Sequence, residues 1–153
     1  MPSDVQGEPS GRSTGHGRRR AARRKAIDIL YQADVTERPP GTVLDEWEKA
    51  GRTVPAYTES LVRGVEGSMP DIDGLLAAHS EGWTVHRMAV VDRTILRVAT
   101  FELRSGVPTA VAINEAVDAA KRLSTEDSGR FINGLLGRIA RESQPSPEAG
   151  PRA

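Results

Sequence analysis

The apolar positions of this chain recur with the 3.6-residue period of an α-helix, and no segment shows the two-residue alternation of a half-buried strand. Prolines and glycines interrupt this period at short intervals, as they do where one helix ends and another begins. The pattern predicts helices at about 18–35, 43–50, 55–67, 71–78 and 85–103, then one capped by Asn114 and one capped by Asp127 or Ser128. We therefore expect an all-α fold, a compact bundle of about seven helices.

The two ends of the chain differ from its middle. Residues 1–17 are rich in Gly, Ser and Pro and have no apolar period, so we expect a disordered lead. Residues 143–153 contain three prolines and are expected to form a disordered tail. Residues 18–142 should then form a single helical domain, which is a common domain size.

Composition narrows the class of protein. Hydrophobic residues make up 37% of the chain, with only two each of Trp, Tyr and Phe, so the core should be aliphatic. The chain has no cysteine, which excludes disulfides and thiolate metal sites. No apolar run is long enough to span a membrane, and no signal peptide is recognisable near Met1. These features predict a soluble cytoplasmic protein.

The net charge of zero conceals an asymmetry along the chain. Residues 1–25 carry seven Lys and Arg against two acids, a net charge of +5, so the remaining residues must carry −5. A basic end on an acidic body predicts an anionic partner bound at one pole, and nucleic acid is the commonest such partner.

The first predicted helix separates an apolar face from a basic one. Its core face should consist of Ala22, Ala26, Ile29, Leu30 and Ala33. Arg20, Arg24 and Tyr31 fall on roughly the opposite side, and Arg19 and Arg23 border the core face. A solvated charged face is one interpretation. The other is a single-stranded RNA surface, because guanidinium groups contact phosphates and exposed rings stack on unpaired bases.

Two later positions have a structural and a functional interpretation. Asp92 falls within the apolar half of the central helix, where a carboxylate needs a partner such as a nearby arginine or must lie at an edge. Phe131 falls at the rim of the apolar stripe of the last helix, where it either packs in the core or offers a half-exposed ring for stacking.

Four sequence blocks, in one order, resemble the NusB family of bacterial transcription antitermination factors. They are the basic opening GRRRAARRKAIDILYQ at 17–32, DRTILR at 92–97, VPTAVAINEA at 107–116 and EDSGRFING at 126–134. The resemblance covers residues from about Arg18 to about Arg141. Several such blocks in register are hard to produce by chance.

The resemblance implies a function and a set of binding residues. It implies a factor that binds boxA-type RNA together with NusE, a ribosomal small-subunit protein, and supports ribosomal RNA transcription by RNA polymerase. It places Asp92 where NusE docks. The residues that it implies for RNA binding are Arg18, Arg19, Arg20, Arg23, Arg24, Tyr31, Asp127, Arg130 and Phe131.

The sequence shows no catalytic constellation. It contains no HExxH, no phosphate-binding glycine loop and no nucleophile elbow, so we expect neither an enzyme nor a bound cofactor or metal. The main alternative is a helical protein–protein adaptor or dimerisation module with a solubilising basic end. A DNA-binding domain is weakly supported, because no tight helix-turn-helix is recognisable. The sequence leaves the oligomeric state open, including a homodimer.

Overall fold

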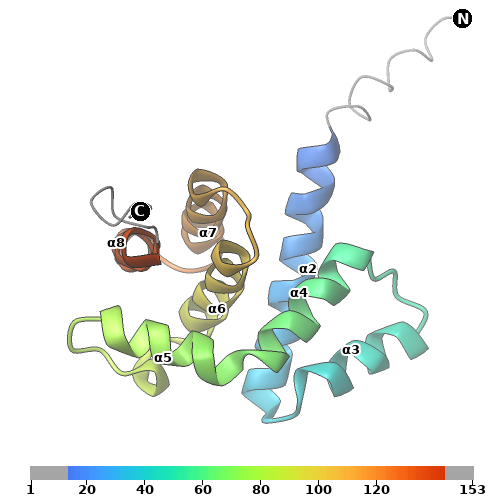
Figure 1. Ribbon diagram of the computed structural model, residues 1–153. Coiled ribbons are helices and arrows are strands. Elements are labelled where there is room, and N and C mark those ends of the chain that lie inside the picture. Colours follow the sequence, from blue (N-terminus) through green and yellow to red (C-terminus); the bar gives the residue numbers. More distant parts are fainter. Residues whose placement is uncertain (1–13, 144–153) are drawn as a thin grey trace, which may run out of the picture. The chain divides into compact units, whose positions relative to one another are not determined.

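A computed structural model describes residues 14–143 of the chain (Figure 1). Within these residues there are seven α-helices, one short 3-10 helix and no strand, so the predicted all-α class is confirmed. The predicted lead and tail fall mostly on residues 1–13 and 144–153, which lie outside the described residues. The helices are α2 (Thr14–Thr36), α3 (Pro40–Lys49), α4 (Ala56–Gly67), α5 (Met69–His79), η2 (Val85–Arg87), α6 (Val90–Arg104), α7 (Thr109–Leu123) and α8 (Glu126–Ser143).

The chain divides into two units, residues 1–63 and residues 64–153. In the first unit, α2 packs against α3, and all five predicted core residues of α2 are buried. Thr58 of α4 donates a buried hydrogen bond of 2.8 Å to the carbonyl oxygen of Ala22. Pro40 occupies the first turn of α3, where its missing N–H costs nothing, so this helix begins three residues before the predicted start.

The second unit contains α5 to α8. Helix α7 packs against both α6 and α8, and α5 also contacts α6 and α8. The interior is aliphatic, as predicted. Its buried residues on the last three helices include Ile95, Leu96, Val98, Ala112, Ala116, Ala119, Ala120, Ile132, Leu135, Leu136 and Ile139. Alanines along α7 allow its neighbours to approach its backbone closely.

Other predicted helix boundaries are also wrong. The first helix begins at Thr14, four residues before the predicted start. The predicted helix 85–103 is two elements, η2 and α6, because Met88 and Ala89 are extended, with ψ angles of 149° and 141°. The helix predicted to be capped by Asn114 begins at Thr109. β-branched residues near its start cost little free energy in a helix, and burial of the alanines on one face of the helix outweighs that cost. The last helix begins at Glu126 and is capped by Thr125, whose hydroxyl accepts the N–H of Ser128 at 3.0 Å.

His79, at the end of α5, links this helix to the last turns of α8. Its Nε2 lies 2.5 Å from a carboxylate oxygen of Glu142, and its Nδ1 lies 2.9 Å from the carbonyl oxygen of Leu75. These two hydrogen bonds, the one to Leu75 foremost, raise the pKa of His79 above its ordinary value. Protonated histidine donates from both nitrogens, so the charged form fits both acceptors.

We therefore expect the folded state to gain stability on acidification from about pH 8 to pH 6. A histidine whose pKa is raised by folding contributes fully below its unfolded pKa, and the contribution is lost as pH rises through the folded pKa. The gain should be at most about 1 kcal/mol, because Glu142 is largely exposed. Urea unfolding at several pH values measures it. A Glu142→Gln variant should flatten part of the dependence, and an unchanged pH profile in that variant would contradict the expectation.

Candidate functional site

The first candidate surface is the basic start of α2. Arg18, Arg19, Arg20 and Arg24 are exposed, and the Tyr31 side chain further along the helix is 44% exposed. Both the exposure of this tyrosine and that of the arginines agree with the helix phase read from sequence. The arrangement presents guanidinium groups and a ring to solvent on one helix.

Tyr57 of α4 supports part of this surface. The guanidinium carbon of Arg19 lies 4.1 Å from the centre of the Tyr57 ring, within the range of a cation–π contact. Arg23 lies 5.8 Å from the same ring centre, but it is only 6% exposed. Arg23, predicted to border the core face, is therefore buried beside Tyr57 of α4, and its part in RNA binding stays a prediction.

An acidic residue that the sequence analysis did not assign also lies on this helix. Asp28 follows Arg24 by one helical turn and is exposed. Neighbouring atoms nevertheless exclude part of the water around its carboxyl group, and this partial desolvation raises the pKa of Asp28; the charges of Arg24 and Arg52 partly oppose that shift. The basic character of α2 is therefore concentrated in its first turns, before Asp28.

The second candidate surface is a pocket of about 370 Å³ in the second unit, here called the aromatic–acidic pocket. It brings together Asp92 at the start of α6, Asp127 and Phe131 at the start of α8, and Trp83 from the preceding loop. Met88, Ala89 and Ser128 complete its lining. Three residues predicted from sequence, assigned there to two different partners, thus line one pocket.

Side-chain hydrogen bonds hold the backbone of Trp83 and of the residues that follow it. The buried Ser80 hydroxyl donates to the carbonyl oxygen of Trp83, and Arg93 donates to the carbonyls of His86, Val85 and Met88 at 3.2–3.4 Å. The Trp83 and Phe131 ring centres lie 5.9 Å apart with an interplanar angle of 57°. The sequence analysis did not assign Trp83 to a candidate site.

Asp92 has a hydrogen-bond partner, but this partner is not an arginine, which the sequence analysis gave as one possibility. Ser128 donates from its hydroxyl to Asp92 Oδ2 at 2.8 Å, and the Thr125 hydroxyl donates to Ser128 Oγ at 3.1 Å. Asp92 is 9% exposed, and its Oδ1 atom is buried with no hydrogen-bond partner among residues 14–143. Leaving a buried carboxylate oxygen without a hydrogen-bond partner is costly.

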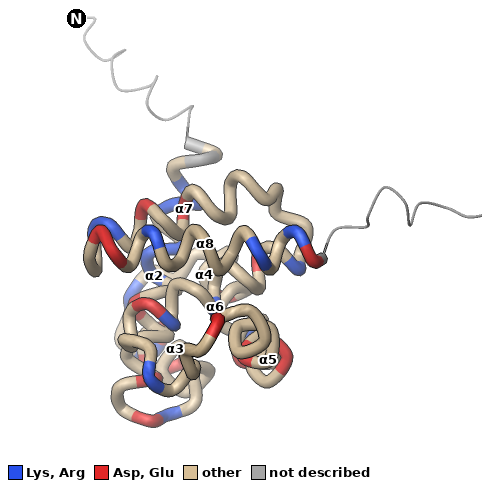
Figure 2. Tube along the Cα trace, turned by 90° about the vertical axis from the view of Figure 1, so that its left-hand side faces the viewer, with Lys and Arg blue, Asp and Glu red and all other residues tan. Residues whose placement is uncertain are grey.

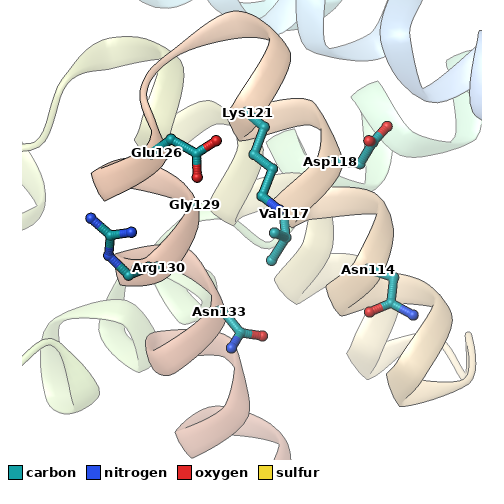
Figure 3. Close-up of a pocket in the computed structure, with 8 residues that line it drawn as sticks. All are labelled: Asn114, Val117, Asp118, Lys121, Glu126, Gly129, Arg130 and Asn133. Atoms are coloured by element: carbon teal, nitrogen blue, oxygen red, sulfur yellow. The ribbon is translucent and has the colours of Figure 1, made fainter.

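A third feature is an open groove of about 550 Å³ between α7 and α8 (Figure 3). Asn114 from α7 and Asn133 from α8, both exposed, are among its lining residues. Lys121 extends from α7 toward Gly129, where an added Cβ would lie 3.4 Å from the lysine Cγ (Figure 3). Arg130, predicted to bind RNA, lines this groove and forms an ion pair with Asp127.

Charges of both signs follow the last helix. Acidic residues lie at both ends of α8 and basic residues between them (Figure 2). Within residues 14–143 no group of three or more His, Asp or Glu side chains is arranged to hold a metal ion. None of the helices described there combines the length and apolar character needed to cross a membrane.

Comparisons with known proteins agree on one family. Residues 20–141 match the model of the NusB family. The chain is 46% identical over 128 residues to the transcription antitermination protein NusB of Salinispora tropica, covering 80% of this chain and 94% of that protein. It is 47% identical over 129 residues to that of Saccharopolyspora erythraea, covering 81% of this chain and 87% of that protein.

Solved structures show the same relationship. T. maritima NusB superimposes with a TM-score of 0.72 at 35% identity, covering 81% of this chain and 91% of that one. The antitermination factor NusB from a crystal structure with NusE and double-stranded RNA gives a TM-score of 0.69 at 28% identity, covering 81% and 96%.

Proposed function

Because this chain belongs to the NusB family, we propose that it acts as a transcription antitermination factor. In this proposal it binds boxA-type RNA together with a NusE-type ribosomal protein and joins them to the RNA polymerase antitermination complex during ribosomal RNA transcription. It has no catalytic part in this process. The relative solved with NusE and RNA supports both classes of partner.

The observation that carries the proposal is the exposed basic start of α2. Five arginines lie within the seven residues 18–24, and four of them are exposed. Clustered like charges on one helix cost stability, which a purely structural role would not explain. Phosphate oxygens can accept hydrogen bonds from these guanidinium groups, and the exposed Tyr31 ring offers a stacking face for a base. Binding through this face would be electrostatic and salt-dependent.

RNA binding by residues at the start of α8 stays a prediction. Asp127 and Arg130 are exposed and paired with each other, while Phe131 is half-buried against Trp83. The α2 face therefore offers the more favourable charge for a phosphate backbone.

We expect the double substitution Arg20→Ala and Arg24→Ala to weaken RNA binding by about tenfold or more at low salt, with the fold intact. Each lost phosphate contact should lower the slope of log affinity against log salt by about 0.7 for a single strand. Fluorescence anisotropy with a labelled boxA-type RNA at several salt concentrations measures both quantities.

The matched control is Arg104→Ala with Arg122→Ala, which removes the same charge from exposed positions of the second unit. This control should leave the affinity and the salt slope nearly unchanged. If the α2 variant binds RNA as tightly as the unmodified protein at low salt, the arginine face is only solvated charge, and the adaptor alternative is favoured.

A further inference from the structure

The loop between α3 and α4 carries an arginine whose backbone is fixed by the way α3 ends (Figure 1). Gly51 follows this helix with a φ angle of 81°, in the left-handed region that favours glycine. The Arg52 N–H donates to the carbonyl oxygen of Trp47 at 3.1 Å, and the Gly51 N–H donates to that of Glu48 at 3.0 Å. These two bonds form a Schellman motif, which places Arg52 directly above the last turn of the helix.

The Arg52 side chain and the loop around it are held as well. The guanidinium carbon lies 3.3 Å from the centre of the Trp47 ring, so the cation stacks on an aromatic face. Trp47 is buried, and its Nε1 donates to the side-chain oxygen of Gln32 on α2 at 3.2 Å. Lys25 of α2 donates from Nζ to the carbonyl oxygen of Thr53 at 3.0 Å. The loop is therefore attached to α2 on both sides of the stacked guanidinium.

The described chain leaves the hydrogen-bond donors of this guanidinium unused. Among residues 14–143, the exposed Arg52 side chain makes no hydrogen bond and no ion pair. Arg63 of α4, by contrast, is exposed but pairs with both Asp45 and Glu59. Stacking on Trp47 covers one face of the Arg52 plane and leaves the N–H groups at its edge for an external acceptor.

Asp28 shows that this guanidinium lies beside the arginine face of α2. The charges of Arg24 and Arg52 both act on the Asp28 carboxylate, so the three side chains are neighbours in the first unit. Lys25 adds a third cation, and its printed partner, the Thr53 carbonyl, is uncharged. One carboxylate cannot neutralise three cations. The basic surface therefore continues past the first turns of α2 onto the loop.

The distribution of these cations favours a polyanion. A single carboxylate of a protein would meet only one of the arginines spread over α2 and the loop, whereas the successive phosphates of a nucleic-acid strand can meet several. The edge of a guanidinium also matches a phosphate, since it can donate two parallel hydrogen bonds. Because the Trp47 ring already holds the Arg52 side chain, little conformational entropy remains to be lost on binding.

We propose that Arg52 is a further RNA-binding residue, which contacts a phosphate where the basic face of α2 meets the loop between α3 and α4. Trp47 is a positioning residue, because its ring presents the guanidinium without touching the strand. This inference deepens the proposed function and rests on it. Neither helix phase nor the family resemblance pointed to these two residues. The RNA would extend from the first turns of α2 to the loop.

Arg52→Ala should weaken binding of a labelled boxA-type single-stranded RNA by about three- to tenfold at low salt, and it should lower the slope of log affinity against log salt by about 0.7, the loss of one phosphate contact. Fluorescence anisotropy at several salt concentrations measures both quantities. Arg63→Ala is the matched control, since it removes an exposed arginine of the same unit whose charge is already paired. This control should leave both quantities unchanged, and thermal unfolding checks that each variant is folded.

Arg52→Lys separates the charge from the stacked guanidinium. It retains a cation, so the salt slope should stay close to that of the unmodified chain. Its ammonium group lacks the planar fork, so the affinity should fall between those of the unmodified chain and Arg52→Ala. A purely structural role of Arg52 at the end of α3 would leave the salt slope the same in all three proteins.

The absence of cysteine from the sequence allows a direct test of contact. An Arg52→Cys variant labelled with a benzophenone maleimide should crosslink to the bound RNA on irradiation. An Arg63→Cys variant with the same label should crosslink far less. Equal crosslinking from the two positions would contradict a contact at the loop.

The outcomes separate this assignment from the proposed function. If the unmodified chain and Arg52→Ala bind RNA with the same affinity and the same salt slope, the Arg52 assignment is wrong and the proposed function stands. If Arg52→Ala weakens binding of a purified NusE-type protein and leaves RNA binding unchanged, the loop contacts protein, which also overturns the assignment. Failure of the folded, unmodified chain to bind RNA at low salt would overturn the proposed function and this inference together.

Discussion

An Asp92→Lys variant should lose roughly 2–5 kcal/mol of binding free energy toward a NusE-type protein while its RNA affinity changes little. The substitution replaces a buried carboxylate with a cation in the aromatic–acidic pocket. Reversing a charge at a partly desolvated contact weakens the docking of a partner there. Isothermal titration with the partner, and anisotropy with RNA, measure the two affinities.

The stability cost of this variant can be separated from its effect on binding. Loss of the hydrogen bond from Ser128 should cost about 1 kcal/mol, and a cation in the first turn of α6 about 0.3–1 kcal/mol more. Asp71 occupies the same position in the first turn of α5 but is exposed and outside the pocket. Asp71→Lys should therefore lose only the stability that comes from placing a cation in the first turn of a helix, and it should bind RNA and the NusE-type protein like the unmodified chain. If the Asp92→Lys variant folds and still binds the NusE-type protein as the unmodified chain does, Asp92 is not part of the interface.

A Gly64→Ala variant should lose roughly 1–3 kcal/mol of folding free energy through overpacking. A Cβ atom added at Gly64 would lie 2.2 Å from Cζ of Phe101 and 2.4 Å from one of its Cε atoms. Real Cβ atoms do not approach so closely, so the half-buried Phe101 ring on α6 must shift to admit the methyl group. Thermal unfolding should show a fall of about 2–4 °C for each kcal/mol in a chain of this length.

Gly74, exposed in the middle of α5, provides the matched control. An added Cβ there meets nothing within 4 Å, so Gly74→Ala should be neutral or stabilising by up to about 1 kcal/mol. Adding Phe101→Leu to Gly64→Ala should recover part of the lost stability, because the shorter side chain makes room for the methyl group. Equal melting temperatures for Gly64→Ala and the unmodified chain would show that the ring moves without cost.

Much of the helical core could be predicted because its periodicity is local. The five apolar residues of the α2 core face are buried as the phase requires, and Asp92 lies in the apolar half of α6 as predicted. The interruption between η2 and α6 could not be predicted from the sequence pattern, for a physical reason. Val85 and Met88 are both buried, so the apolar period continues across the extended residues, and the carbonyls there are satisfied by Arg93, a partner that periodicity does not reveal.

The candidate sites were predictable to different degrees. Exposure of Arg20, Arg24 and Tyr31 followed from helix phase alone. Burial of Arg23 depends on Tyr57, which lies on another helix, and could not be derived from the phase of α2. The aromatic–acidic pocket joins α6, α8 and the loop before η2, and Asp92 and Ser128 are 36 positions apart in the sequence. Tertiary contacts of this kind leave no local pattern in a sequence.

Competition for a labelled boxA-type single-stranded RNA tests the central claim most directly. The competitors are the same unlabelled RNA, the corresponding RNA duplex and a DNA duplex of the same sequence, all at one salt concentration. We predict that the single-stranded RNA competes at the lowest concentration, that duplex DNA competes much more weakly, and that the Arg20→Ala, Arg24→Ala variant reduces this preference. Equal competition by duplex DNA, or no measurable RNA binding by the folded chain at low salt, would contradict RNA binding through the basic face of α2.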